Sequence, residues 1–395
     1  MNHARPALSL RLLCVWLFIS AFYYTQTLFS GEFILDFDEG FAHKFTKYVV
    51  CGAISAYLIL RSRNLAAGGF SLFMLLLVSV HLLTGGIPNL FATTVLTLAT
   101  MAGFSCTLQI YPAYTRRIAR AVVFSAAAVG CLSVIELTLL ADKFLGYWAA
   151  TGGIRSISTM FNPNNLGLYL GAAILILPWV ALSRGMMLVL SVPILFGLAA
   201  SGSRTAWVSM IVCLLVLFFL PNAGRRMRGV VIRYRWYLGF LLAIMVATML
   251  LVMGAINTIS IESESRGGDL LTANIRWENF VAYVEQIDGN SLLPDLSDKR
   301  IAHIQDNVYL VFFNTFGLAC FIVLSIVLGL GLRTGPRLLD NGRFAWGILT
   351  TYYLVSGLSG SFINSFPNNQ LFFIALGGFL VPRAIARRKV AGVMK

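Results

Sequence analysis

The chain has 395 residues, of which 58% are hydrophobic and only 12% are charged, and its formal net charge is +14. A soluble domain is about 45–50% apolar and about 25% charged. The chain therefore has too few polar residues to cover its surface in water. These numbers exclude an ordinary soluble protein and indicate one that faces lipid over much of its area.

Twelve apolar segments follow one another along the chain, and a helical crossing of a bilayer takes about 20 apolar residues. They lie near 9–30, 45–61, 66–85, 89–110, 119–141, 165–183, 186–200, 204–220, 236–257, 307–332, 344–362 and 370–382. We predict an all-α polytopic membrane protein with about 12 transmembrane helices, forming a single integral membrane domain over 1–395. The six cysteines all lie inside these segments, without a CxxC pair, which predicts neither a disulfide framework nor a zinc site.

The charge alternates in the gaps between these segments. Every second gap is basic, and these gaps and the two ends of the chain together hold 21 of the 30 basic residues but only one acid, Asp340. The positive-inside rule assigns them to the cytoplasm, together with both termini. Scattered arginine clusters beside spanning helices do not form the basic, aromatic-rich face of a nucleic-acid-binding protein. We therefore expect no nucleic-acid partner.

Two gaps on the outward side, 142–164 and 258–306, exceed the 2–8 residues that a connection between helices usually needs. The second contains a predicted helix from Asp269 to Ile287. Its apolar residues recur at helical spacing: Leu270, Ala273, Trp277, Val281, Val284 and Ile287. We predict an amphipathic helix on the outer membrane surface, with Trp277 at headgroup depth. A cover helix with solvated charges explains the same pattern.

Nine basic residues remain on the outward side, and two of them have unusual surroundings. The nine are Lys44, Lys47, Lys143, Arg155, Arg204, Arg266, Arg276, Lys299 and Arg300. Arg155 lies in a Gly/Ser-rich run, and Arg204 lies in a turn bracketed by apolar segments. A guanidinium there is costly unless it meets an anion or a buried partner, and arginine suits phosphate oxygens. Snorkelling to the headgroups explains each arginine taken singly, but several on one face favour an anionic ligand.

The second outward loop ends with His303, Asp306 and Asn307. If this stretch is helical, His303 and Asp306 lie three residues apart on one face. Asp306 is also a good cap for the helix that follows, where the helix dipole stabilises its charge. Both roles can hold at once.

Four short motifs occur in a fixed order along the chain. They are Phe161–Gly167 after Arg155, Ser201–Trp207, Arg276–Trp277, and Asp306–Leu310 with Gly317 further on. In this order and topology they resemble the superfamily of O-antigen ligases and Wzy-type polysaccharide polymerases, over roughly residues 150–320. The resemblance implies a GT-C-like glycosyltransferase of the bacterial inner membrane. Its active site would face the periplasm and use no metal, nucleotide or other cofactor.

The resemblance also implies roles for particular residues. The donor would be a glycan on undecaprenyl pyrophosphate, and outward arginines would bind the pyrophosphate: Arg155, Arg204 and Arg276, with Arg266 as a further candidate. Asp306 or His303 would be the catalytic base that activates the acceptor hydroxyl. Asn164, Asn307 and Tyr309 would support the site. The implied partners are the lipid-linked donor and acceptor glycans, membrane lipids and a chain-length regulator protein.

One departure from the ligase pattern favours a polymerase. In ligases a histidine stands directly before the Asn-x-Tyr-Leu pattern, eleven residues ahead of the glycine. Counted back from Gly317, that position is Asp306, and the only nearby histidine is His303. Aspartate there resembles polymerases of O-antigen and other exopolysaccharides. We therefore predict inverting polymerisation of lipid-linked repeat units, with ligation of the glycan to lipid A-core as the alternative.

Two other classes of protein compete with the glycosyltransferase. A flippase or transporter is one, because twelve helices is a common transporter count. Transport predicts polar groups near the middle of the membrane, but the predicted helix centres are almost free of charge and Glu136 lies near an outer end. A scaffolding subunit is the other, and it would not need several outward arginines and a long outward loop.

Overall fold

The computed structural model describes most of the chain as helices and turns. The described residues are 8–30, 41–83, 89–151, 154–180, 182–219, 278, 281–285, 307–317, 341–360 and 362–380. No strand occurs among them, so the predicted all-α class is confirmed for this part of the chain. The chain divides into two compact units. Unit 1 comprises Met1–Ser20, Asp38–Ala121 and Asn279–Lys395, and unit 2 comprises Ala21–Phe37 and Val122–Glu278.

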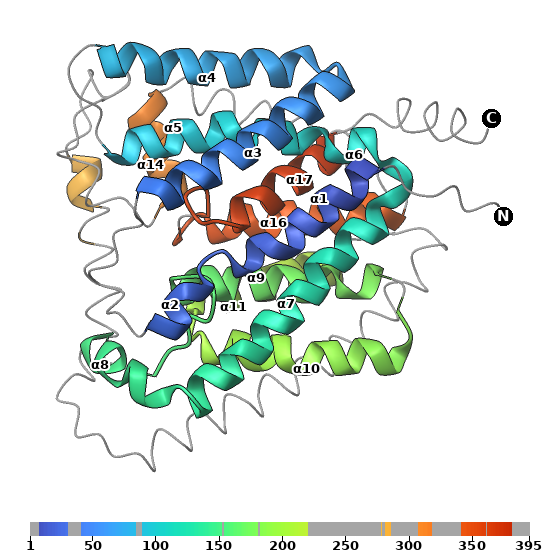
Figure 1. Cartoon of the computed structure of the whole chain (residues 1–395), viewed down its shortest axis with the longest axis vertical. Helices are drawn as coiled ribbons and strands as arrows, with labels where there is room; N and C mark the ends of the chain where they lie inside the picture. The colour runs from blue at the N-terminus through green and yellow to red at the C-terminus, as the bar shows by residue number, and fades with distance from the viewer. Residues whose placement is uncertain are drawn as a thin grey trace. The chain divides into compact units, whose positions relative to one another are not determined.

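Unit 1 joins helices from the two ends of the sequence, drawn in blue and red in Figure 1. Its elements are α1 (Leu8–Ile19), α3 (Phe41–Ser62), α4 (Leu65–Leu83), α5 (Asn89–Met101), η3 (Ala102–Cys106), α6 (Thr107–Ile110), η4 (Pro112–Tyr114), the start of α7 (Thr115–Thr138), α14 (Val308–Phe316), α16 (Asn341–Ser356) and α17 (Asn368–Leu380). α16 packs on α17, α4 packs on α5, and α17 packs on η3. The core of the unit therefore depends on contacts between segments far apart in the chain.

Glycines let three elements of unit 1 meet backbone to backbone. A Cβ added at Gly377 of α17 would lie 1.8 Å from the Ser105 carbonyl oxygen of η3. A Cβ added at Gly103 of η3 would lie 2.2 Å from the Ser55 carbonyl oxygen of α3. The Gly103 N–H also donates to Ser55 Oγ at 2.7 Å. Such close approach is typical of helices that pack through small residues in membranes.

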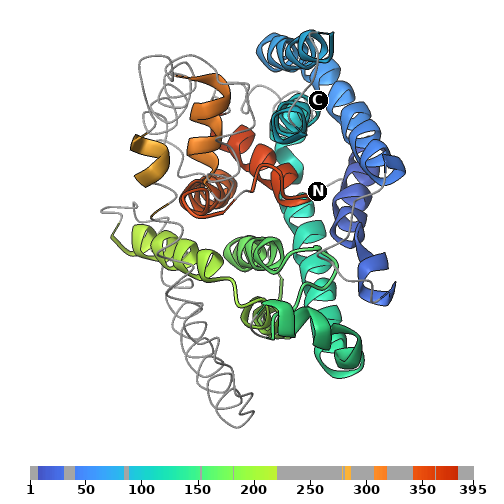
Figure 2. The same cartoon turned by 90° about the vertical axis from the view of Figure 1, so that its left-hand side faces the viewer.

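Unit 2 is arranged around the buried helix α9. Its elements are α2 (Thr25–Ser30), most of α7, α8 (Ala141–Thr151), α9 (Pro163–Ile176), η5 (Leu177–Trp179), α10 (Arg184–Ala200) and α11 (Arg204–Phe219). α9 packs against both α10 and α11, as Figures 1 and 2 show. Every α9 residue from Leu166 to Ile176 is buried. Burial on all sides explains why this helix has no polar face.

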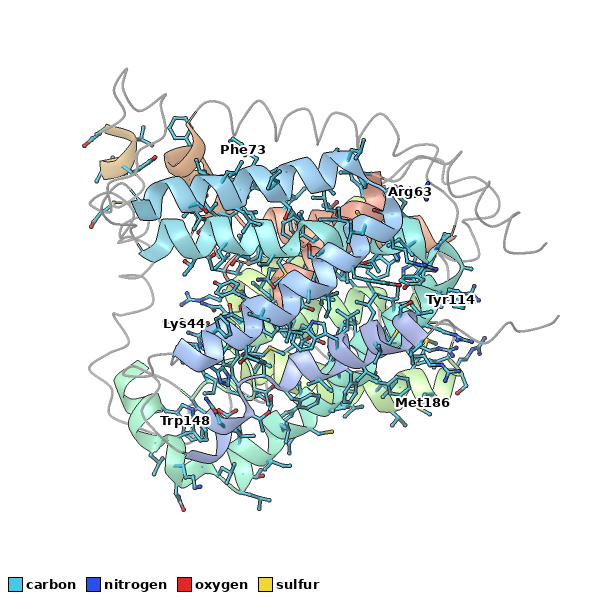
Figure 3. All side chains as sticks on the ribbon, turned by 45° about the horizontal axis from the view of Figure 1, so that its top comes forward. Lys44, Arg63, Phe73, Tyr114, Trp148 and Met186 are labelled. Atoms are coloured by element: carbon cyan, nitrogen blue, oxygen red, sulfur yellow. The ribbon has the colours of Figure 1, made fainter. Side chains whose placement is uncertain are left out.

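The outward segment predicted as a loop over 142–164 begins with a helix. α8 runs from Ala141 to Thr151, and its Phe144 and Trp148 are buried with Leu28 and Ile157 in one hydrophobic cluster. Figure 3 shows Trp148 on this helix. α8 is not among the predicted apolar segments, because an eleven-residue helix is too short to cross a bilayer.

Two stretches of the described chain are long and apolar enough to cross a membrane, namely Thr93–Ile110 and Pro112–Thr138. Four shorter apolar helices accompany them: Leu8–Phe22, Leu65–Ser79, Arg184–Ala200 and Arg204–Leu215. α4 buries Met74 but exposes Leu72 and Phe73, and Figure 3 shows Phe73 pointing outward. Large exposed apolar patches are rare on proteins in water, so this surface suits lipid. The twelve crossings stay a prediction, and the segment 236–257 lies outside the described residues.

The predicted change of charge across the membrane can be followed on α3. Lys44, assigned to the outward side, lies near the start of this helix, and Arg63, assigned to the cytoplasm, directly follows its end. Figure 3 shows the two residues at opposite ends of α3. A helix of 22 residues spans about 33 Å, or roughly the hydrocarbon core of a bilayer.

Candidate functional site

The start of α9 places Asn164, the first predicted supporting residue. Asn162 is the N-cap of α9, and its side chain accepts a hydrogen bond of 2.7 Å from the Asn164 N–H. Pro163 occupies the first helical position, where its missing N–H costs nothing and its fixed φ fits the helix. The Asn-Pro-Asn motif is therefore a helix start. It leaves the Asn164 side chain in the first turn of α9.

Arg155 connects two of the sequence motifs. Its Nε–H donates to the Ser201 carbonyl oxygen at 3.1 Å, and its Nη2 donates to Asn164 Oδ1 at 2.9 Å. The side chain is half-buried. One planar guanidinium thus bridges the first turn of α9 and the turn between α10 and α11. A fixed fork of N–H donors makes this geometry specific for arginine.

The turn between α10 and α11 is shaped to receive that guanidinium. Gly202 has a φ of +59°, in the left-handed region that favours glycine. A Cβ at Gly202 would lie 3.3 Å from Arg155 Nε. Ser201 Oγ accepts from the Ser203 N–H at 3.2 Å. The Ser-Gly-Ser sequence therefore forms a tight turn with room beside it for Arg155.

Arg204 follows this turn directly. It is the first residue of α11, and its side chain is exposed. Ser203 Oγ accepts from the Ala206 N–H at 3.4 Å, as the N-cap of a helix does. The structure therefore brings Arg155 against the turn that carries Arg204. Two basic residues lie beside the first turns of α9 and α11, where backbone N–H groups and the helix dipole favour an anion.

A buried carboxylate holds the loop that carries Arg155. Glu136 of α7 is fully buried. Its Oε2 accepts from Ser156 Oγ and from the Ser158 N–H, each at 2.6 Å, and its Oε1 accepts from the Ile157 N–H at 3.1 Å. From the sequence, Glu136 is expected near an outer end, and no role is predicted for it. An acid inside an otherwise apolar segment was the signal for it, because such a residue is costly and needs a partner.

The other predicted residues that the structure describes lie in unit 1. Asn307 is the N-cap of α14, and its Oδ1 accepts from the N–H groups of Tyr309 and Leu310 at 3.0 and 3.1 Å. Its Nδ2 donates to the Leu358 carbonyl oxygen at 3.2 Å. The predicted capping role of Asp306 is therefore wrong by one residue. The neutral amide suits this position because it caps α14 and also donates to the turn that follows α16, which a carboxylate cannot do.

Tyr309 reinforces the same junction between α14 and α16. Its hydroxyl donates to the Leu354 carbonyl oxygen, and the Val308 N–H donates to the Gly357 carbonyl oxygen at 2.9 Å. The predicted supporting residues Asn307 and Tyr309 thus fix the beginning of α14 to the end of α16. Four of the predicted residues, Arg266, Arg276, His303 and Asp306, lie outside the described residues.

The predicted amphipathic helix is described only at 278 and 281–285, where it is helical. Tyr283 is buried against Val311 and Phe313 of α14. Val284, which belongs to the predicted apolar stripe, is 43% exposed. Within this turn, Tyr283 therefore makes the contact with α14, and the stripe does not predict which residue is buried. The predicted stripe leaves tyrosine out because of its polar hydroxyl, although the ring of this side chain is apolar.

Lys47 of α3, one of the basic residues predicted to lie on the outward side, is buried. Its side chain is 8% exposed, and its Nζ lies 5.3 Å from the ring centre of Tyr48 and 5.8 Å from that of Phe366. An ammonium over an aromatic face is stabilised by the ring quadrupole. Trp16 lies against the same Phe366 ring, 6.2 Å from centre to centre. This cluster ties α1 and α3 to the segment before α17.

Within the described part of the chain, no group of three or more His, Cys, Asp or Glu side chains lies close enough together to hold a metal ion. Comparison with known proteins adds no family: no protein-family model matches the chain, and no curated protein matches it.

Proposed function

We propose that the chain is a Wzy-type glycosyltransferase of the bacterial inner membrane, which polymerises repeat units carried on undecaprenyl pyrophosphate at the periplasmic face. The proposal includes twelve crossings, a GT-C-like architecture and cytoplasmic termini. The observation that supports it most is the bridge made by Arg155. Its guanidinium contacts Ser201 and Asn164, so that two motifs of the suspected superfamily meet in space beside Arg204.

The charge of this cluster suits a diphosphate. Two acceptors that orient Arg155, a carbonyl and an amide oxygen, are neutral. These two contacts fix the direction of the guanidinium. Arginine side chains bind phosphate oxygens through charge-assisted, bidentate hydrogen bonds. Groups oriented in advance toward a developing charge stabilise the transition state most strongly.

In the proposed reaction, a sugar hydroxyl of the acceptor attacks the anomeric carbon of the donor. The new glycosidic bond forms as the bond from that carbon to the pyrophosphate oxygen breaks, and direct displacement inverts the anomeric configuration. Asp306 or His303 takes the hydroxyl proton, a role that typically contributes ~10²–10⁴-fold. Undecaprenyl pyrophosphate leaves with its additional negative charge held by the arginines.

Complementation of a gene deletion tests the proposal. We expect Arg155→Ala and Arg204→Ala to leave single repeat units where the unaltered gene restores long polymer, as seen on a gel of surface polysaccharide. Arg184→Ala is the matched control, because Arg184 is also exposed but lies at the opposite end of α10 from Ser201. Full-length polymer from both site variants, at normal amounts in the membrane, would refute the proposal.

The deletion strain itself separates the other functions. Loss of a polymerase leaves single repeat units on the acceptor, whereas loss of a ligase leaves full polymer on its lipid carrier. Reconstitution in vesicles separates a flippase, which moves lipid-linked sugar across the bilayer without lengthening it. For the base, we expect Asp306→Asn to abolish long polymer. Long polymer from this variant would remove Asp306 from the mechanism.

A further inference from the structure

Glu136 is a buried acid that the proposed chemistry does not use. An ionised carboxylate away from water costs several kcal/mol unless donors satisfy it. Here three donors do so, all from consecutive residues: the Ser156 hydroxyl and the N–H groups of Ile157 and Ser158. These residues directly follow Arg155. The only acid within the predicted segment 119–141 is thus committed to the loop that carries the candidate pyrophosphate ligand.

The same loop is held from other directions. The Trp148 Nε1–H of α8 donates to the Arg155 carbonyl oxygen at 3.1 Å, and the Ser156 N–H donates to the Ala200 carbonyl oxygen at 2.8 Å. Ser158 has a φ of 45°, which is unfavourable for a residue other than glycine. Its N–H and hydroxyl are both bonded, to Glu136 and to the Val129 carbonyl oxygen. Glu136 therefore helps to stabilise a backbone conformation that the loop would not adopt alone.

We infer that Glu136 is a positioning residue for Arg155. Its carboxylate fixes the backbone of 156–158, and this backbone aims the Arg155 side chain at Ser201 and Asn164. The inference rests on the proposed function for the anion that Arg155 binds. The three hydrogen bonds of Glu136 go to the Ser156 hydroxyl and to two backbone N–H groups. They therefore orient Arg155 through the backbone of the residues that follow it.

A carboxylate is required because all three groups facing it are donors. Glutamine has the same shape but only one acceptor oxygen, and its amide nitrogen would face N–H or O–H groups. Glu136→Gln therefore removes the positioning and fills the same volume. Ser156→Ala is the milder variant, because it removes one bond of the three. Thr138→Val is the matched control: Thr138 is the last residue of the same helix, and its hydroxyl donates to the Val134 carbonyl oxygen of α7 itself.

The test measures binding of undecaprenyl pyrophosphate to the purified full chain in lipid nanodiscs. Hydrogen bonds to charged groups contribute about 1.5–3 kcal/mol, so we expect Glu136→Gln to weaken binding about tenfold or more. Ser156→Ala should weaken it less, and Thr138→Val should not change it. In the Arg155→Ala background, Glu136→Gln should have no further effect, because no arginine is left to position.

Two results would overturn the inference. One is normal binding by Glu136→Gln while Arg155→Ala binds poorly. The other is an equal loss from Glu136→Gln with and without Arg155, which would show a general structural effect. If the unaltered chain does not bind the lipid, the proposed function fails instead. The positioning is then judged by hydrogen exchange over 154–160: faster exchange in Glu136→Gln supports it, and unchanged exchange refutes it.

Discussion

At the scale of single residues, the geometry of Arg155 distinguishes arginine from other cations. Two of its hydrogen bonds leave the guanidinium from different nitrogens, toward Ser201 and toward Asn164. A lysine ammonium is a point charge on a flexible stem and cannot reproduce this fork. A positive charge alone therefore does not explain why arginine occupies position 155. Replacing it by lysine, which keeps the charge, tests the role of the fork.

We expect Arg155→Lys to weaken binding of undecaprenyl pyrophosphate about tenfold, since at least one hydrogen bond to a charged group is lost. The thermal unfolding temperature should change little, because the side chain is only half-buried. Arg184→Lys, an exposed substitution of the same kind, should change neither quantity. Equal affinity for Arg155→Lys and the unaltered protein would show that only the charge matters.

At this scale, the sequence predicts the charged side chains of the site but not the groups that they bind. Arg155 and Arg204 are predictable because an arginine beside apolar segments needs a reason. The same cost singles out Glu136 within its apolar segment, but the sequence does not predict the hydrogen-bond partners of this carboxylate. They are backbone N–H groups, which every residue carries, and only the fold selects those of Ile157 and Ser158.

At the scale of elements, two of the predicted motifs lie at the beginnings of helices. Asn162 caps α9 and Asn307 caps α14. Both belong to motifs that are predicted to support a glycosyltransferase site, and both have a local role as helix caps. For Asn307, that role includes joining α14 to α16 through the Leu358 carbonyl oxygen.

We expect Asn307→Ala to lower the free energy of unfolding by about 0.5–2 kcal/mol, the usual loss for an N-cap. Asn307→Asp should lose less, because it keeps the oxygen that accepts from Tyr309 and Leu310 and loses only the donor to Leu358. Thermal unfolding in detergent measures both variants. A larger loss for the aspartate than for the alanine would contradict the capping role.

The contact of α17 with η3 supplies another prediction. A Cβ at Gly377 would lie 1.8 Å from the Ser105 carbonyl oxygen, so Gly377→Ala forces the two backbones apart. Overpacking of this kind typically costs about 1–3 kcal/mol. Gly69→Ala in α4 is the control, because a Cβ there meets nothing within 4 Å. We expect a lower unfolding temperature for the first variant only, and equal temperatures would contradict the packing of α17.

At the scale of the whole molecule, the alternation of charge predicts which ends of the helices face the cytoplasm. α3 offers a matched pair of positions, Lys44 near its start and Arg63 just beyond its end. In a variant without the native cysteines, we expect Lys44→Cys to react with a membrane-impermeant maleimide added to cells with a permeabilised outer membrane. Arg63→Cys should react only after the inner membrane is opened. The opposite pattern would reverse the predicted orientation.

By itself, the sequence determined the helical class, the positions of most helices and the residues of the Arg155 cluster. These follow from local properties of the sequence. They are the length of the apolar segments, the free-energy cost of an arginine beside lipid, and the capping and turn residues at the ends of helices. The starts of α10 and α11 lie within two residues of the predicted segments for the same reason.

Only the tertiary structure decided which groups meet. It placed Ser201 and Asn164 against Arg155, turned Ser156 to Ser158 toward Glu136, and made Asn307 rather than Asp306 the cap of α14. The physical reason is that these partners are backbone groups and neutral amides, which have no signature in composition. Their hydrogen bonds form only when packing around α9 and between α14 and α16 brings donors and acceptors within reach.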